Sequence, residues 1–348
     1  HRITSNDPPL SKGGVPGQPK KEDPLFAAGR EKMNQFMEAA PGLPRLLGAR
    51  GYVSLQTGKW WQGNFRRGGF TYGMTAGDTL KGGRHGDEGL EIGRKTMQPI
   101  YDFTAAAKKE GKPFFLWYAP MMPHEPHNPP DRFLEKYKNK APTVHVARYW
   151  AMIEWFDETC GQLLDHLDKE GLTENTIIVY LADNGWIQNP EEERFAPRSK
   201  QSQYDGGLRT PILVRWPAKV KARESSALAS SLDIAPTLLR AAGADPVKEM
   251  GGLNLLDEAA MAARETLFGE CFTHNAVDLD VPAKSLRWRW CIQKNLKLVV
   301  PGPGEPGAPV ELYDLKADQQ EERNLAKERA EDVTRLRAAM DTWWKGEP

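Results

Sequence analysis

Short apolar runs alternate with amphipathic helical stretches along most of this 348-residue sequence, and this alternation limits the fold more than any other feature. The runs at 113–118 (PFFLWY), 176–182 (TIIVYLA) and 211–216 (PILVRW) are nearly continuous in apolar residues. Such runs predict strands buried on both faces of a sheet. A fourth strand, of alternating character, is predicted at 52–57.

Helical periodicity fills the intervals between these strands. A short helix is predicted before Gly51, and longer ones at 99–110, 146–170 and 231–243, the last with Asp233 as its N-cap. The helix at 146–170 has the clearest apolar face, formed by Tyr149, Met152, Ile153, Phe156, Cys160, Leu163, Leu164 and Leu167. The order of elements predicts an α/β fold with a largely parallel sheet and helices on both faces.

The pattern changes near residue 265. Apolar runs at 296–300 and 310–315 flank a loop rich in proline and glycine, which predicts an antiparallel pair. An amphipathic helix follows, with Val333, Leu336, Met340 and Trp343 on one side. We therefore predict two domains, an α/β domain at 1–264 and a small antiparallel β/α subdomain at 265–348.

Composition excludes several classes of protein. Lys+Arg and Asp+Glu both number 47, so no net positive charge favours nucleic-acid binding. No apolar run approaches the roughly 20 residues that span a bilayer. Three scattered cysteines (Cys160, Cys271, Cys291) are too few for a disulfide scaffold or a cysteine-rich zinc site. The polar opening from His1 contains no signal peptide, and we interpret the chain as a fragment or a processed product.

Polar residues follow three of the predicted strands, at the edge where ligands bind in α/β sheets. Asp183 and Asn184 offer oxygen ligands for Ca²⁺ or Mg²⁺, although such a DNG sequence also closes simple turns. His124 and His127 are candidates for donating to an oxyanion or protonating a leaving group, against the alternative of surface histidines in a proline-rich loop. No further Cys or His is near enough to favour zinc.

Further candidates carry positive charge or an aromatic ring. Lys59 and Lys200 are candidate anion-binding residues, although isolated lysines are more often solvated surface charges. Arg209 is predicted to pair with Asp205 in a structural ion pair. The adjacent Trp60 and Trp61 either line a substrate cleft or pack in the core.

Six segments resemble sulfatase motifs in the order typical of that family. They are GYVSLQTGKWWQG, KPFFLWYAPMMPHEPHNPP, the run from AMIEWFDETCGQLLDHLDKEGL to YLADNG, KQSQYDGGLRTPILVRWPAKV, SLDIAPTLLRAAGA and VELYDLKADQQEERNLA. The resemblance implies an alkaline-phosphatase-like fold and hydrolysis of sulfate esters, plausibly on a sugar or aryl group. It assigns the divalent cation, usually calcium, to Asp183 and Asn184, and contact with the sulfate to Lys59, His124 and Lys200. Trp61 and His127 are then candidate substrate-binding residues.

Two departures from the family pattern qualify this interpretation. Trp61 stands where the family has a histidine, and the sequence has no Cys/Ser-x-Pro-x-Arg motif to mature into the formylglycine nucleophile. We expect that motif, and the family's paired aspartates, upstream of His1 in a periplasmic or secreted parent protein. The chain itself is expected to bind metal weakly and not to turn over sulfate esters. A phosphoric or phosphonic ester hydrolase and a non-catalytic sulfated-glycan-binding relative are the alternatives.

Overall fold

The strand predicted at 52–57 forms the centre of a three-stranded parallel sheet in the computed structural model, which describes residues 4–11, 23–77 and 88–346. β1 (Val53–Gly58) pairs in parallel with β2 (Tyr72–Gly73) on one side and with β3 (Phe114–Ala119) on the other. The register that sets Gly58 opposite Ala119 brings the carboxyl ends of β1 and β3 to the same edge. The parallel arrangement predicted from the sequence is confirmed for these three strands.

The next two strands pair differently from the prediction. β4 (Ile178–Leu181) and β5 (Ile212–Arg215) form an antiparallel two-stranded sheet. The prediction that the apolar runs are buried on both faces is also wrong, since Trp117 of β3 is 39% exposed and Leu213 of β5 is 61% exposed. The physical reason is that β4 and β5 form a sheet of only two strands and β3 pairs only with β1 among the described residues, so each lies at a sheet margin, where fewer neighbouring side chains cover its two faces.

The helices follow the sequence periodicity closely. α3 (Gln98–Lys109) packs Ile100 and Phe103 against Leu55 of β1. The helix predicted at 146–170 is α5 (Val144–Lys169), which begins after a Thr143 cap. The remaining described helices before residue 230 are α1 (Pro24–Ala39), α2 (Leu43–Gly48), η3 (Glu88–Glu91), α4 (Asp131–Tyr137), η4 (Thr173–Asn175) and α6 (Asp205–Leu208).

The helical stretch predicted at 231–243 differs in its cap. It consists of η5 (Ser231–Asp233) and α7 (Ile234–Ala241), and Ser230 supplies the side-chain cap. Asp233 is the third residue of that capping box, and its carboxylate also accepts two hydrogen bonds from Arg264. The local sequence pattern did not predict that Asp233 is buried in an ion pair with Arg264.

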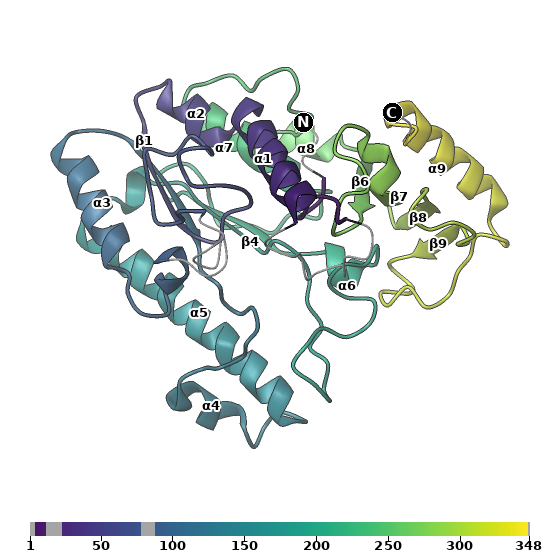
Figure 1. Cartoon of the computed structure of the whole chain (residues 1–348), viewed down its shortest axis with the longest axis horizontal. Helices are drawn as coiled ribbons and strands as arrows, with labels where there is room; N and C mark the ends of the chain where they lie inside the picture. Colours follow the sequence, from purple (N-terminus) through teal and green to yellow (C-terminus); the bar gives the residue numbers. More distant parts are fainter. Residues whose placement is uncertain (1–3, 12–22, 78–87, 347–348) are drawn as a thin grey trace.

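The C-terminal part of the chain forms an antiparallel sheet with one covering helix. Its strands are β6 (Thr266–Phe272), β7 (Leu286–Gln293), β8 (Leu296–Pro301) and β9 (Glu311–Asp314), in that spatial order. α9 (Ala330–Trp343) packs on the sheet, and the short helices α8 (Glu258–Ala262) and η6 (Pro282–Ser285) precede β6 and β7. We call β6–β9 and α9 the C-terminal unit; it lies at one end of the molecule, with α4 and α5 extending from the other part (Figure 1). The boundary predicted at 264/265 stays a prediction.

The described opening residues, 4–11, form an irregular chain that contacts α1 and the chain between β6 and β7. Asp7 forms a parallel bridge with Asn275 and an ion pair with Arg30 at 2.5 Å.

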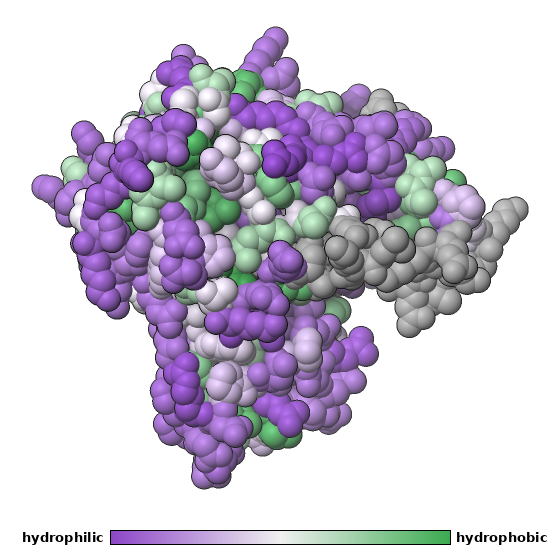
Figure 2. Space-filling view, turned by 60° about the vertical axis from the view of Figure 1, so that its left-hand side comes forward, coloured by the Kyte–Doolittle hydropathy of each residue, from purple (hydrophilic) through white to green (hydrophobic). Residues whose placement is uncertain are grey.

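Hydrophilic side chains cover most of the face shown in Figure 2, with hydrophobic residues scattered between them. None of the helices in residues 4–11, 23–77 and 88–346 is long and apolar enough to cross a membrane.

Candidate active site

The end of β1 places Lys59 at the edge that β1 and β3 share. Gly58 has φ +73°, and a Cβ there would lie 1.9 Å from the Ala119 carbonyl oxygen, so this turn requires glycine. The Lys59 backbone is held on both sides, because its N–H donates to Ala119 at 2.7 Å and its carbonyl accepts from the Trp117 indole at 3.1 Å. Its ammonium lies 3.1 Å from Asp183 Oδ2, at the end of β4.

The loop after β3 places His124 against the second lysine. His124 Nδ1 lies 2.7 Å from the Glu125 carbonyl, and Nε2 lies 3.3 Å from Lys200 Nζ. The Glu125 carbonyl can only accept a hydrogen bond, so Nδ1 carries the proton. The Lys200 ammonium can only donate, so Nε2 carries the lone pair. Burial lowers the pKa of His124 below its ordinary value of 6.5, and the charges of Lys200 and Lys59 act in the same direction.

Lys200 lies over the ring of Trp186, with Nζ 5.4 Å from the ring centroid. Burial lowers the pKa of Lys200, and the positive charge of Lys59 lowers it further. Lys59 therefore lies close enough for its charge to act on the Lys200 ammonium. An anion placed between them would relieve this repulsion.

The structure therefore brings together the five residues that the sequence indicated from three strand ends and one distant segment. Lys59 contacts Asp183, and His124 contacts Lys200. Asn184 is adjacent to Asp183, and its amide nitrogen donates to the Gly185 carbonyl at 2.8 Å, which leaves its oxygen as the available ligand atom. The roles of these residues are taken up below as proposals.

The oxygen donors fit a hard divalent cation in kind but not in number. Asp183 and Asn184 supply a carboxylate and an amide oxygen, the donors that Ca²⁺ and Mg²⁺ prefer. Calcium takes 6–8 such ligands. Within the described residues, however, no group of three or more His, Cys, Asp or Glu side chains is placed to hold a metal ion. No chemical step is therefore derived through a metal here.

Two other candidate residues have surroundings that the sequence did not reveal. His127 is 2% exposed and packs against the rings of Tyr149 and Trp186, with its backbone N–H donating to Glu193 at 2.5 Å. It therefore does not face an open rim, because aromatic rings cover it. Trp61 is half-buried and follows Lys59 by two residues in the chain.

Trp60, in contrast to Trp61, is a core residue. It is buried and packs edge-on against Phe70 and Trp117, with ring centroids 5.1 Å and 5.8 Å away. The alternative that an aromatic residue here packs in the core is thus confirmed for Trp60.

Sequence reasoning missed two residues that support the site. Trp186 contacts the rings of both His124 and His127 and stacks on Tyr149. The signal available in the sequence is its position directly after Asp183-Asn184-Gly185. Arg94 donates to the Met121 carbonyl at 2.9 Å and to Asn128 Oδ1 at 2.8 Å, and so holds the loop that carries His124.

The predicted pairing of Arg209 with Asp205 is wrong. Asp205 instead pairs with Lys297 of β8, at 2.8 Å, and Arg209 contacts Asp205 through a backbone hydrogen bond. The reason is that α6 turns the Asp205 carboxylate toward the C-terminal unit.

Comparison with known proteins gives concordant results. The family model described as Sulfatase matches residues 8–244, and the model described as N-sulphoglucosamine sulphohydrolase, C-terminal, matches residues 195–342. The chain is 29% identical over 269 residues to an N-acetylgalactosamine-6-O-sulfatase of Bacteroides thetaiotaomicron, covering 69% of the chain and 48% of the relative. It is 31% identical over 192 residues to human arylsulfatase A, covering 52% of the chain and 35% of the relative. The chain thus spans about half the length of these relatives or less.

Solved structures show the same fold. Ps i-CgsB in complex with k-i-k-neocarrahexaose matches with a TM-score of 0.71 and 19% identity, over 99% of this chain and 79% of that one. BT4656 in complex with D-glucosamine-2-N,6-O-disulfate matches with a TM-score of 0.68 and 19% identity, over 89% of this chain and 82% of that one.

Proposed function

The chain belongs to the sulfatase family and has its alkaline-phosphatase-like α/β fold, and we propose that it forms the anion-binding part of a sulfuric ester hydrolase. The observation that carries the proposal is that Lys59, paired with Asp183, lies close enough to the contacting pair of Lys200 and His124 for its charge to lower the pKa of both. Lys59 and Lys200 supply the positive charge that a sulfate group requires.

Cleavage of a sulfate ester builds negative charge on the leaving oxygen. In our proposal Lys59 and Lys200 hold the sulfate oxygens and offset that charge, since preorganised cations stabilise developing charge without reorganising. His124 assists the leaving group as a relay: its Nε2 takes a proton from the Lys200 ammonium, which it contacts, and passes that proton to the leaving oxygen, so that Lys200 becomes a neutral amine.

We propose that Asp183 and Asn184 supply two of the oxygen ligands of a divalent cation, Ca²⁺ or Mg²⁺. Bound there, the cation would neutralise part of the sulfate charge. We assign no nucleophile within this sequence, which lacks a Cys/Ser-x-Pro-x-Arg motif for formylglycine. Residues 1–348 alone are accordingly expected to bind a sulfate ester without turning it over.

The substrate class that we propose is a sulfated glycan or a small sulfate ester. Two solved structures with this fold are complexes of those proteins with a neocarrahexaose and with a glucosamine disulfate. Trp61, two residues after the proposed sulfate-binding Lys59, is the residue that we assign to the organic part of the ester. His127 supports the site through Trp186. We also propose a periplasmic or secreted location, which the family resemblance supports.

Binding of p-nitrophenyl sulfate, measured by saturation-transfer NMR, tests the proposal. We expect binding by the chain and an affinity about tenfold lower in Lys59→Ala and Lys200→Ala. The matched control is Lys138→Ala, because Lys138 is exposed on the surface near α4 and pairs with Glu135 alone among the described ion pairs. Equal binding by all variants contradicts the proposal. Tighter binding of p-nitrophenyl phosphate than of the sulfate would favour phosphoric ester chemistry instead.

A further inference from the structure

Lys297 of β8 is a fully buried lysine whose ammonium lies between two carboxylates. Nζ is 2.8 Å from Asp205 Oδ1 and 2.7 Å from Glu321 Oε1, and the Lys297 and Glu321 side chains are 0% and 1% exposed. Buried charges are costly unless they are paired in good geometry. None of the steps proposed for the sulfate ester uses this cluster, so its presence needs a separate explanation.

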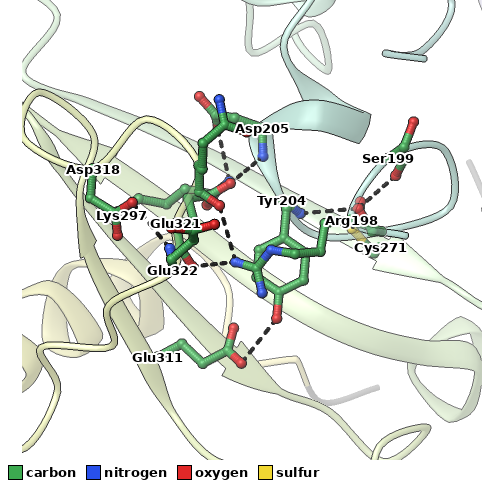
Figure 3. Close-up of polar contacts among 12 residues, drawn as sticks. Arg198, Ser199, Tyr204, Asp205, Cys271, Lys297, Glu311, Asp318, Glu321 and Glu322 are labelled. Carbon is green, nitrogen blue, oxygen red and sulfur yellow. Dashed lines mark hydrogen bonds and ion pairs between the residues drawn. The ribbon is translucent and has the colours of Figure 1, made fainter. Parts of the chain in front are cut away.

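The cluster joins the C-terminal unit to the segment that carries Lys200. Asp205 ends this segment, which we define as residues 198–205 and call the Lys200 segment. The Asp205 backbone N–H donates to Glu321 Oε2 at 2.5 Å, so Glu321 binds both Lys297 and the segment itself. Figure 3 shows Lys297, Glu321 and Asp205 grouped at one end of the segment. The C-terminal unit thus holds that end through two contacts to one residue.

The other end of the Lys200 segment is held by the same unit. The Arg198 guanidinium donates to the backbone carbonyl of Glu321 and lies 3.5 Å from the centroid of the Tyr204 ring. The Tyr204 hydroxyl donates to Glu311 Oε1 of β9 at 3.2 Å (Figure 3). Residues at both ends of the segment are therefore anchored to β8, β9 and the chain that follows β9.

The backbone around Lys200 has a conformation that needs such anchors. Arg198 and Gln201 have φ of 60° and 66°, in the left-handed region that non-glycine residues rarely adopt. Such residues persist only where the surroundings hold them. Here the Gln201 carbonyl accepts from Arg287 of β7 at 3.2 Å. The Lys200 side chain leaves the segment toward His124 and Trp186 of the other part of the molecule.

We propose that Lys297 and Glu321 are positioning residues for the sulfate site: they hold the Lys200 segment in its strained conformation and thereby set where the Lys200 ammonium lies. They act through Asp205 and Arg198 and do not touch the substrate. This inference rests on the proposed contact between Lys200 and the sulfate group. The C-terminal unit would then contribute to the affinity for the sulfate ester although the residues that we assign to bind it lie elsewhere.

Lys297→Met tests the proposal against a matched control in the same sheet. Arg289→Met removes another buried cation, which pairs with Asp341 at 2.9 Å and, among the described contacts, does not reach the Lys200 segment. Glu321→Gln is the milder second variant, which keeps the side-chain shape in case Lys297→Met does not fold. All variants are compared at a temperature where circular dichroism shows them folded.

Two readouts separate positioning from stability. The first is affinity for p-nitrophenyl sulfate, which we expect to fall about tenfold or more in Lys297→Met and Glu321→Gln and less than about twofold in Arg289→Met. The second is the ¹³C resonance of reductively methylated Lys200, assigned with Lys200→Arg, which is shifted by the ring current of Trp186. We expect this resonance to move toward its position in a free lysine in Lys297→Met and Glu321→Gln and to stay in place in Arg289→Met.

The outcomes keep the two proposals apart. If the unmodified chain does not bind the ester, the proposed function fails, and the Lys200 resonance still decides the positioning role. If the chain binds the ester but the resonance and affinity are unchanged in Lys297→Met and Glu321→Gln, the positioning role is wrong. Equal losses in Arg289→Met and Lys297→Met would likewise overturn it, since they would reflect general destabilisation.

Discussion

β8 of the C-terminal unit and the two-stranded sheet of β4 and β5, which precedes Asp183, differ in how completely their residues are buried. In β8 five of the six residues are buried, and Leu298, Leu312 and Leu336 form a core with α9. In β4 and β5 no residue is buried, and Leu213 is more than half exposed. The chemical residues of the candidate site nevertheless lie at the ends of β1, β3 and β4.

This difference teaches that a strand can lead to a candidate site residue whether it is buried or not, because β1, which precedes Lys59, has five of its six residues buried and β4, which precedes Asp183, has none. Residues proposed to bind the sulfate group lie on loops, where side chains can face a ligand. Polar contacts from the C-terminal unit reach one of these loops, the Lys200 segment. Four predictions test this comparison.

The buried ion pair between Arg264 and Asp233 is the strongest challenge to the comparison, because it is well buried although it lies outside the C-terminal unit. Arg264→Met leaves the Asp233 carboxylate without its cation, and we expect it to cost about 4 kcal/mol in the free energy of unfolding. Urea denaturation measures this. The control is Arg240→Met, whose exposed pair with Asp245 is expected to contribute less than about 0.5 kcal/mol.

The same pair also predicts the response to acid. Burial opposes ionisation of Asp233, but hydrogen bonds from Arg264 and two backbone N–H groups hold its pKa below the ordinary value of 3.8. The stability from this group is therefore present above 3.8 and lost as pH falls through the lowered pKa. If Arg264→Met and the unchanged chain have the same free energy of unfolding, the pair does not stabilise the fold.

Core truncation sharpens the comparison directly. Leu298→Ala removes a fully buried side chain of β8, and we expect a loss of about 3 kcal/mol through lost burial and the cavity left behind. Leu213→Ala makes the same chemical change on exposed β5, where less than about 0.5 kcal/mol is expected. Thermal unfolding of the two variants measures the difference. Equal losses would mean that β5 is covered in solution by something other than the described residues.

Lys59→Ala separates function from stability at the site. The pair with Asp183 is largely exposed, with 69% of the Asp183 side chain accessible, so the expected loss in the free energy of unfolding is below about 0.5 kcal/mol. We expect the affinity for p-nitrophenyl sulfate to fall about tenfold, since a charge-assisted contact is lost. If Lys59→Ala unfolds at a lower urea concentration but keeps its affinity for p-nitrophenyl sulfate, Lys59 stabilises the fold and does not bind the sulfate group.

The pH dependence of binding gives the smallest expected effect. The lowered pKa keeps His124 neutral near pH 7, and it gains its proton below 6.5. Because an added cation attracts the anion, affinity for p-nitrophenyl sulfate is expected to rise roughly two- to fivefold as pH falls through that range. The ligand keeps its charge there, so the rise reports on the protein. In His124→Gln the profile should be flat; an unchanged rise would assign the titration to another group.

Protonation of His124 has the opposite effect on stability. The folded state binds the proton less readily than the unfolded state, so the free energy of unfolding falls as pH decreases below 6.5. Below pH 6.5 we expect the melting temperature without ligand to fall while the affinity for p-nitrophenyl sulfate rises. Both results together would assign the two effects to His124. Arg289→Met, a substitution outside the site, is the control: its pH profile of binding should match that of the unchanged chain.

Local periodicity in the sequence determined the elements and the order of the site motifs. The helix predicted at 146–170 is α5 (Val144–Lys169), and the one at 99–110 is α3 (Gln98–Lys109), because an apolar face repeats at helical spacing whatever lies far away in the chain. Lys59, His124 and Asp183 were found because each follows an apolar strand, and strand ends meet at one edge of the sheet.

Only the tertiary structure decided which of these groups meet and which are covered. Asp205 and Lys297 are 92 residues apart, and no local pattern indicates that a charge on β8 pairs with the segment carrying Lys200. His127 has the same loop context as His124 but is enclosed by Tyr149 and Trp186. The physical reason is that burial and charge pairing depend on contacts between distant segments, whereas secondary structure depends on spacing along one.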